Sequence, residues 1–435
     1  MNILSLLAAA LVLLTPGLAA QSLPAAPAPA GAGASLLTLA ECRALALRQN
    51  QRLTVAARRQ QAAEAAQAAA KTGRLPKLDA SSTGYYVRGL RGTPLEAQGV
   101  ATGVGMSQPI YSGGRIRSQI ALAGLQAEVS GEDVRAARQQ LVAETDQTYW
   151  QAIALREQVG LAERNRLQLQ ALVRDLDHKY QAGLVYKADL LRAQVQLRDA
   201  DVQLLRARDE QQLSQQVLRQ LIGWPAGDSL RLADTLEGEF LPVAAADYQA
   251  RAQVQRPDLR QLALNTRADS LLIALARSAR RPQVNASANA LLLVQRPNVF
   301  LPDRTLTPAY ALVSVNLPLV HWKEHRLLEA QRRYQAQANA AQLTEARQQV
   351  QLEISRDLLR LNQAVRRIEL QRLTVAQAAE NLRLNDNRFR AGLLSLVDLL
   401  QAQTVSQQAA AALVEAQAEY RMAEAALARA TGEQD

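Results

Sequence analysis

The arrangement of residues that most resembles a reactive centre lies at positions 321–325, His-Trp-Lys-Glu-His. The spacing His-x-x-Glu-His occurs in one class of zinc peptidases, because on a helix it places two imidazoles on one face with a carboxylate between them. A catalytic zinc also needs a third protein ligand, and none is evident in the sequence. The segment lies where a predicted strand meets a predicted helix. A zinc metallopeptidase therefore stays a remote alternative, and no cofactor is expected.

Two carboxylates, Asp189 and Asp398, occupy matching places, each at the start of a predicted helix that follows a glycine-containing turn. An acid in the first turn of a helix complements the helix dipole, a local role worth about 0.3–1 kcal/mol. In a symmetric oligomer the same acids would form rings of negative charge, which select cations or bind blocking ions. Arg192, three residues after Asp189, offers a second possibility, an ion pair across helices that holds the opening closed.

The two turns before these acids share the tripeptide Ala-Gly-Leu. Glycine permits a left-handed backbone there, and a tip without side chains allows another protein to approach closely. The turns are either plain helical hairpins or docking tips. Their residues are Ala182, Gly183, Leu184, Ala391, Gly392 and Leu393.

These turns belong to an internal duplication. Tyr180–Gln194 and Phe389–Gln403 agree at eight of fifteen positions without a gap, at an offset of 209 residues. At the same offset Pro109 faces Pro318. Repetition at this long period indicates a duplicated unit rather than a short solenoid repeat.

Each copy is predicted to contain a helix, two strands, a very long helix, a turn and a last helix. No proline interrupts the chain from about Ile116 to Tyr180, and apolar residues recur there at near-heptad spacing. Such a helix is roughly 100 Å long, and its narrow apolar seam favours edge-to-edge packing as in coiled coils. The first copy is expected over 38–245, with strands at about 76–90 and 99–111, helices at about 114–181 and 186–222, and an equatorial segment at 223–245. The second is expected over 246–435, with strands at about 282–296 and 308–320 and helices at about 323–388 and 394–431.

The central parts of the predicted strands are free of charge. Ala80–Val87, Ala97–Gly114, Pro282–Gln295 and Thr305–Trp322 contain no Asp, Glu, Lys or Arg. Their period-two alternation is typical of transmembrane β-strands, which place one face against lipid and the other towards a lumen. Strands in hydrocarbon must pair every backbone group, and closed membrane barrels use about eight strands or more. Four strands per chain therefore predict an oligomer. A periplasmic coiled-coil scaffold without a channel is the alternative, although it leaves the uncharged segments unexplained.

The chain begins with an apolar, uncharged segment, Met1–Ala20, which is expected to be a signal peptide, followed by a flexible linker over 21–37. The formal net charge of +10 favours anionic lipid head groups or anionic cargo over nucleic acid as partners of an exported protein. Cys42 is the only cysteine, which excludes an internal disulfide, and it is expected to be a small core residue.

Three features together resemble the TolC-like outer-membrane factor family: Leu37–Leu45, the corner Ser107–Arg115, and the duplicated Ala-Gly-Leu…Asp-Leu-Leu segments. The resemblance implies a mainly α fold with a small membrane β part, in which a homotrimer forms a 12-stranded β-barrel, four strands per chain, continued by a long α-helical barrel. It implies a bacterial outer-membrane location with the helices in the periplasm.

The same resemblance implies a passive export channel of a tripartite efflux pump or a type I secretion system, not an enzyme. The implied partners are a periplasmic adaptor protein, an inner-membrane transporter and outer-membrane lipid, and no nucleic acid. The implied periplasmic gate is Asp189, Arg192, Asp398 and Gln401, with Gln401 at the place of a second Asp in better-known members. The strand-to-helix corners are Pro109, Gly113, Gly114 and Pro318, and the second corner lacks the glycine pair.

Overall fold

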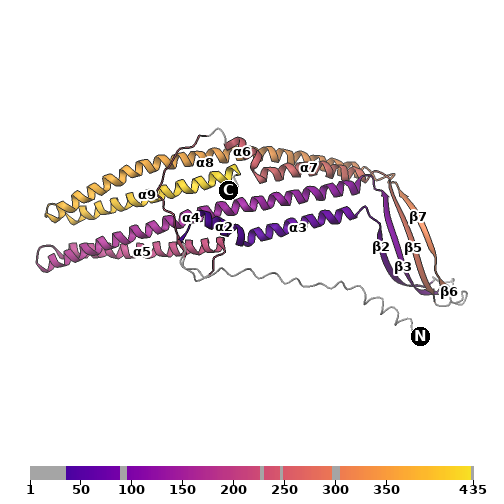
Figure 1. The fold of residues 1–435 in the computed structure, drawn as a ribbon, viewed down its shortest axis with the longest axis horizontal. Coiled ribbons are helices and arrows are strands. Elements are labelled where there is room, and N and C mark those ends of the chain that lie inside the picture. Colours follow the sequence, from indigo (N-terminus) through magenta and orange to yellow (C-terminus); the bar gives the residue numbers. More distant parts are fainter. Residues whose placement is uncertain (1–35, 89–95, 226–229, 245–247, 296–303, 433–435) are drawn as a thin grey trace, which may run out of the picture.

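The computed structural model describes residues 36–88, 96–225, 230–244, 248–295 and 304–432. The protein is elongated, with a small sheet at one end and two helical hairpin tips at the other (Figure 1). The signal peptide and most of the predicted linker lie outside the described residues. Leu36–Leu37, the end of that linker, forms strand β1 and pairs in parallel with β4 (Arg231–Leu232). The linker prediction is wrong there, because Leu37 is buried in the core instead of exposed to solvent.

The two copies fold alike. The first comprises β1, α2 (Leu39–Gln49), α3 (Gln51–Thr72), β2 (Lys77–Arg88), β3 (Glu96–Tyr111), α4 (Arg115–Gln181), α5 (Lys187–Ile222) and β4. The second comprises α6 (Tyr248–Gln255), α7 (Pro257–Ser278), β5 (Gln283–Gln295), β6 (Arg304–Leu306), β7 (Ala309–Asn316), α8 (Glu324–Arg390) and α9 (Leu396–Thr431). The long helices α4 and α8 have 67 residues each, and α5 and α9 have 36 each. Each boundary of these four helices recurs at the 209-residue offset of the duplication.

The strands form one antiparallel sheet in the order β2, β3, β5 and then β7, with the short β6 also paired to β5. β6 and β7 are two parts of one edge, separated at Pro308, whose nitrogen carries no hydrogen to donate. Its carbonyl still accepts a hydrogen bond from the Leu291 amide at 2.9 Å. Both edges of the sheet, β2 and β7, lack a neighbour among the described residues. No described helix is both long and apolar enough to cross a membrane.

The first helix of each copy is broken once, where a single continuous helix was expected. Asn50 separates α2 from α3, and Arg256 separates α6 from α7; both residues have an extended backbone. Each break residue reaches the end of its copy's last helix. Asn50 Nδ2 donates to the Leu221 carbonyl at 2.9 Å, and Arg256 Nη1 donates to the Ala430 carbonyl at 3.2 Å. Leu221 and Ala430 are themselves 209 residues apart, so the duplication has preserved this link with different side chains.

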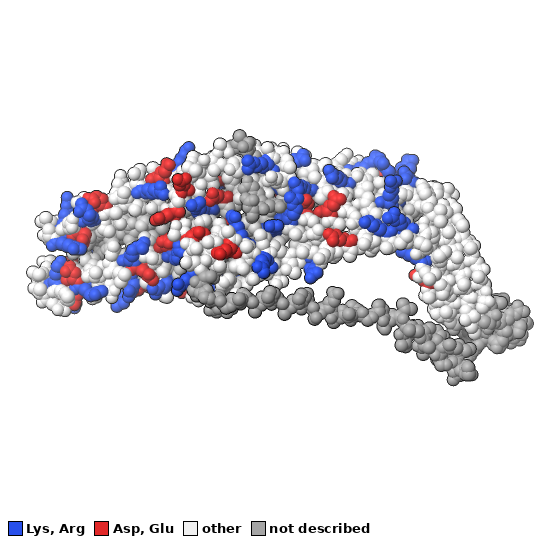
Figure 2. All heavy atoms as spheres, in the orientation of Figure 1, with Lys and Arg blue, Asp and Glu red and all other residues white. Residues whose placement is uncertain are grey.

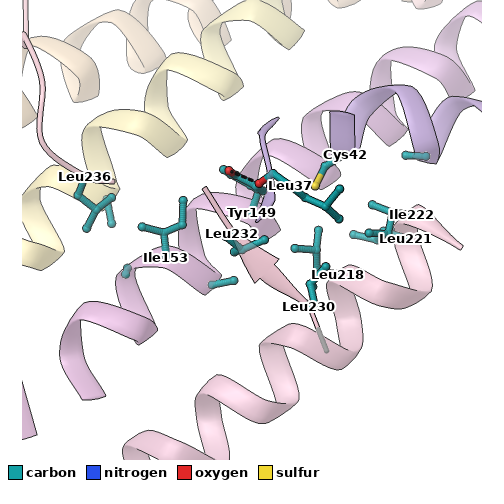
Figure 3. Close-up of a cluster of buried hydrophobic side chains, with 14 of the residues drawn as sticks. Leu37, Cys42, Tyr149, Ile153, Leu218, Leu221, Ile222, Leu230, Leu232 and Leu236 are labelled. Carbon is teal, nitrogen blue, oxygen red and sulfur yellow. Dashed lines mark hydrogen bonds between the residues drawn. The ribbon is translucent and has the colours of Figure 1, made fainter. Parts of the chain in front are cut away.

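Around the first break lies the largest buried cluster, which joins α2, α4, α5 and the β1–β4 pair (Figure 3). The Tyr149 hydroxyl donates to Asp234 Oδ2 at 2.6 Å and also lies 3.1 Å from the Leu37 carbonyl. These bonds fasten the start of the described chain to the middle of α4. Cys42 is fully buried in the same cluster, as expected, and burial raises the pKa of its thiol to about 12. A neutral, inaccessible thiol is unreactive.

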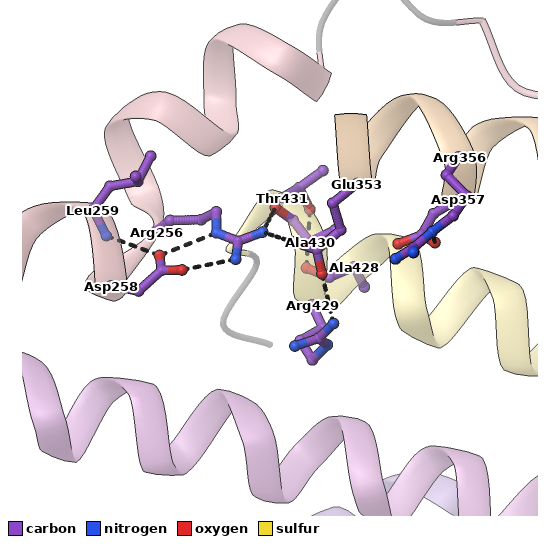
Figure 4. A network of polar contacts seen from close by, with 10 residues as sticks. All are labelled: Arg256, Asp258, Leu259, Glu353, Arg356, Asp357, Ala428, Arg429, Ala430 and Thr431. Atoms are coloured by element: carbon purple, nitrogen blue, oxygen red, sulfur yellow. Dashed lines mark hydrogen bonds and ion pairs between the residues drawn. The ribbon is translucent and has the colours of Figure 1, made fainter. Parts of the chain in front are cut away.

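At the second break a polar network lies beside a smaller apolar cluster (Figure 4). Arg256 donates to both carboxylate oxygens of Asp258 and, at 2.7 Å, to Glu353 of α8. Arg429 near the end of α9 donates to the other oxygen of Glu353, also at 2.7 Å. Glu353 and the Arg256 side chain are largely buried. The network therefore holds α7, α8 and α9 together at the middle of the molecule.

We expect Asn50→Ala to destabilise the protein by about 1–2 kcal/mol, because it removes the N-cap of α3 and leaves the buried Leu221 carbonyl without its donor. The measurement is urea unfolding followed by circular dichroism. Asn385→Ala is the matched control, since Asn385 makes one exposed hydrogen bond on α8. Equal stability of the two variants would contradict the role of Asn50.

Candidate functional site

The two hairpin tips have the same backbone geometry. Gly183 and Gly392 have φ values of 75° and 73°. At each tip the residue after the glycine donates its N–H across the helix end, Leu184 to Lys179 at 2.8 Å and Leu393 to Arg388 at 2.9 Å. This hydrogen bond satisfies a carbonyl of the last helical turn. It requires a residue with a left-handed backbone, which glycine adopts without steric cost.

The tips are bare. A Cβ at Gly183 or Gly392 would meet no atom within 4 Å. Leu184 and Leu393 are 74% and 78% exposed, and Ala182 and Ala391 are also exposed. One exposed leucine at the end of each hairpin gives the tips a small apolar surface that another protein can cover.

The predicted gate residues lie one to two turns from the tips. Asp189 is in the first turn of α5, where Arg192 Nη1 approaches it at 3.8 Å within the same helix. Between the described residues of one chain, Arg192 therefore does not pair across helices. Asp398 is exposed in the first turn of α9, with Gln401 exposed one turn further. One chain does not bring Asp189 and Asp398 into a common hydrogen bond or ion pair among the described contacts.

Asp398 has a local role as well. Ser395 is the N-cap of α9; its hydroxyl donates to Asp398 Oδ2 at 2.6 Å and accepts from the Asp398 amide at 3.2 Å. This reciprocal pair stabilises the helix start. One carboxylate oxygen remains available for a cation or for a neighbouring chain.

Beside the tips, a groove of about 630 Å³ runs between α4 on one side and α8 and α9 on the other. Its floor includes Leu172 and Phe389, and Lys179 lies 5.5 Å above the Phe389 ring. Ion pairs line the groove, including Lys179 with Asp175 and Arg390 with Asp386. The groove is a second surface, continuous with the tips, on which a partner can lie.

The His-x-x-Glu-His segment does not adopt the helical arrangement of the peptidase motif. His321 precedes α8 and His325 lies inside it, so the two histidines do not both lie on one helix as in the peptidase motif. The ring centroids lie 4.6 Å apart with the planes tilted by 44°, and His321 Nδ1 lies 3.6 Å from Glu324. Within the described ranges, no three His, Cys, Asp or Glu residues gather as metal ligands.

The strand-to-helix corners carry the feature that sequence reasoning missed. In the first copy Gly113 and Gly114 are left-handed, with φ of 64° and 94°. The second corner has the same geometry at Trp322 and Lys323, with φ of 41° and 68°. A left-handed backbone costs an L-residue roughly 1–2 kcal/mol. The absence of the glycine pair from the second corner was the available signal in the sequence. It did not show whether the second corner has a different backbone geometry or keeps the same geometry with other residues.

A further unpredicted detail concerns apolar residues left exposed on the helices. On α5 they recur at heptad-like spacing and are 43–62% exposed: Leu191, Val195, Val202, Leu205, Leu213 and Val217. On α8 they are 63–71% exposed: Leu352, Leu359, Leu370 and Leu373. Stripes of this kind are typical of coiled-coil seams that lack their partner.

Comparison with known proteins gives a consistent picture. The sequence profile described as Outer membrane efflux protein matches residues 43–224 and 249–433. The fold is similar to the crystal structure of CusC, with 17% identity, 91% of this chain and 92% of that chain covered, and a TM-score of 0.78.

Two outer membrane channels are similar to the same degree. The Campylobacter jejuni CmeC channel has 20% identity, coverage of 91% and 86%, and a TM-score of 0.79. The Neisseria gonorrhoeae MtrE channel, solved in its open state, has 20% identity, coverage of 91% and 89%, and a TM-score of 0.75. Comparison with curated protein sequences finds no match.

Proposed function

This chain belongs to the outer membrane efflux protein family, and from that premise we propose that three copies form one passive export duct through which a partner pump drives cargo. The protein is an export channel of the outer membrane, and its helical part lies in the periplasm. The family consists of channel proteins, and this chain is proposed to perform no chemistry of its own.

The observation that carries the proposal is the pair of open sheet edges. β2 and β7 each present unpaired backbone groups, and every described residue of β7 is exposed. Such groups cannot remain unpaired in hydrocarbon. Pairing β2 of one copy with β7 of the next closes the sheet, and three copies with four strands each would give twelve strands.

The exposed helix stripes support the same assembly. Among the described elements only α4 packs extensively on α5, and α9 packs on both α4 and α8. The apolar stripe of α5 and that of α8 are left on the outer sides of these pairs. We infer that the α5 stripe of one copy packs against the α8 stripe of its neighbour, which continues the barrel as a helical tube.

We expect the purified protein to be a trimer that conducts ions across a planar bilayer. Val195→Asp with Val202→Asp should lower both the trimer fraction and the conductance, because it places two charges in the α5 stripe. The measurements are native mass spectrometry and bilayer conductance. Gln194→Asp with Gln203→Asp adds the same charge at exposed positions beside the stripe and should leave both unchanged. A conducting monomer, or equal losses in both variants, would sink the proposal.

At the periplasmic mouth we propose that Asp189, Arg192, Asp398 and Gln401 form the gate. A threefold axis would replicate the free oxygen of Asp398 into a ring of negative charge, which favours cations at the opening. Gln401 contributes no charge, so the ring depends on Asp398 and on Asp189, part of whose charge is offset by Arg192.

Asp398→Asn should raise the single-channel conductance or weaken block by divalent cations, because it removes the charge but keeps an oxygen for the Ser395 hydroxyl. Ser395→Ala is the matched control: it removes the cap and leaves the charge, so divalent block should persist. An equal rise in single-channel conductance in both variants would show that the effect comes from loss of the helix cap and not from loss of the charge. Unchanged conductance and block in Asp398→Asn would remove Asp398 from the gate.

We further propose that the tips bind a periplasmic adaptor protein, which joins the duct to an inner-membrane transporter. The exposed Leu184 and Leu393 and the adjoining groove along α4 and α8 support this assignment. The residues of the contact are Ala182, Gly183, Leu184, Ala391, Gly392 and Leu393.

Leu184→Asp with Leu393→Asp should abolish co-purification of the periplasmic adaptor protein, because each Asp replaces an apolar contact by a charge that must be desolvated. Bilayer conductance should stay at the wild-type value, since neither leucine supports the fold. Retained adaptor binding would exclude the tips as the docking surface.

A further inference from the structure

The positive charge of the chain is concentrated at the junction between sheet and helices. Four segments meet there, residues 71–79, 112–118, 277–281 and 321–333. Together they hold twelve Lys and Arg but three Asp and Glu, an excess of nine out of the formal net charge of +10. Figure 2 shows Lys and Arg gathered beside an almost uncharged sheet. An uncharged sheet followed by a basic band is the charge profile expected where hydrocarbon gives way to lipid head groups.

Within this band the second corner forms a pocket. Its volume is about 420 Å³, and its lining includes Arg280, Lys323, His325 and Arg326. Both ring nitrogens of His325 are buried and have no hydrogen-bond partner among the described residues. Buried polar atoms are normally satisfied, so these nitrogens point to a ligand with hydrogen-bonding groups.

The acidic residues of the chain do not form ion pairs with every basic residue of the pocket. Glu329 pairs with Arg277, Arg280 and Arg333. Lys323 and Arg326 are exposed and make no ion pair with any residue that the structure describes. Two cations and an unsatisfied imidazole around one recess are suited to a phosphate group.

The backbone of the corner also requires an explanation. At the positions of Gly113 and Gly114, the second copy keeps the left-handed geometry with Trp322 and Lys323. Strain of this kind persists where the side chains serve a purpose. Trp322 is 91% exposed, and an exposed tryptophan at the edge of an apolar, uncharged sheet is typical of a membrane–water interface.

We propose that the pocket lined by Arg280, Lys323, His325 and Arg326 binds the phosphate of an anionic phospholipid in the inner leaflet of the outer membrane, with Trp322 inserted beside it. The inference rests on the outer-membrane location of the proposed channel. Lipid is favoured over anionic cargo because Trp322, next to Lys323, has the chemistry of the interface rather than of a hydrated lumen.

Tryptophan fluorescence provides the test. The full-length protein is reconstituted in vesicles of phosphatidylcholine with a minor fraction of phosphatidylglycerol, and either lipid carries bromine near the head group as a quencher. The other two tryptophans, Trp150 and Trp224, pack against the buried cluster around Tyr149 and should not be quenched. Brominated phosphatidylglycerol should quench Trp322 several-fold more than its mole fraction predicts, and added salt should reduce this preference.

Lys323→Gln with Arg326→Gln should lower the preference about threefold or more, since each basic residue near an anionic surface contributes appreciably to binding. Arg347→Gln with Arg366→Gln, two exposed positions farther along α8, removes the same charge and should leave it unchanged. Trp322→Gly with Lys323→Gly should keep or raise the unfolding temperature, as glycine relieves the left-handed strain. Phosphatidylglycerol bound in the pocket should raise the unfolding temperature of the wild-type protein. In the glycine variant this rise should disappear.

Equal quenching of Trp322 by both lipids, or equal losses in the pocket and control variants, would overturn the inference while leaving the channel intact. A changed anion conductance of Lys323→Gln with Arg326→Gln, without a change in lipid preference, would assign the pocket to cargo and also overturn it. Absence of quenching by either lipid would instead contradict the membrane location itself, which separates failure of this inference from failure of the proposed function.

Discussion

The pairing of backbone groups at the edges of the sheet governs the rest of this protein. A four-stranded antiparallel sheet leaves one row of N–H and C=O groups open on β2 and another on β7. Water could satisfy these groups on a soluble protein, but hydrocarbon cannot. The chain is thus a unit that is completed by its copies. The nearly uncharged strands and the unpartnered stripes on α5 and α8 are consistent consequences of that requirement.

The duplication distributes this task over two similar halves. The helices of both copies have the same lengths, and the break in the first helix of each copy is tied to the end of the last one. The side chains that make this link differ between the two copies, however. Asn50 caps a helix within an apolar cluster, whereas Arg256 acts through carboxylates of α7 and α8. Equivalent backbone geometry with different chemistry indicates that the fold requires a side-chain donor from the break residue to this carbonyl, whichever residue type supplies it.

Much of this architecture could be predicted from the sequence. The long uninterrupted heptad pattern and the alternating uncharged segments reflect local periodicity, and the predicted mainly helical, duplicated fold and the family resemblance are confirmed. The corner at Trp322 and Lys323 could not be predicted, because neither residue favours a left-handed backbone and only tertiary context holds them there. The break at Asn50 was missed for a related reason: no proline or glycine marks it. The gate and adaptor residues stay predictions, since they involve surfaces that one chain leaves open.

The matched lengths of the four long helices have an evolutionary corollary. Because α4 and α8 carry the tips to one level and α5 and α9 return from them, a deletion in any single helix would tilt its hairpin out of register with the others. Shortening the periplasmic span would need coordinated removal of whole turns in four separate stretches of coding sequence. Reach across the periplasm should therefore change rarely, in steps, and in both halves of the chain at once.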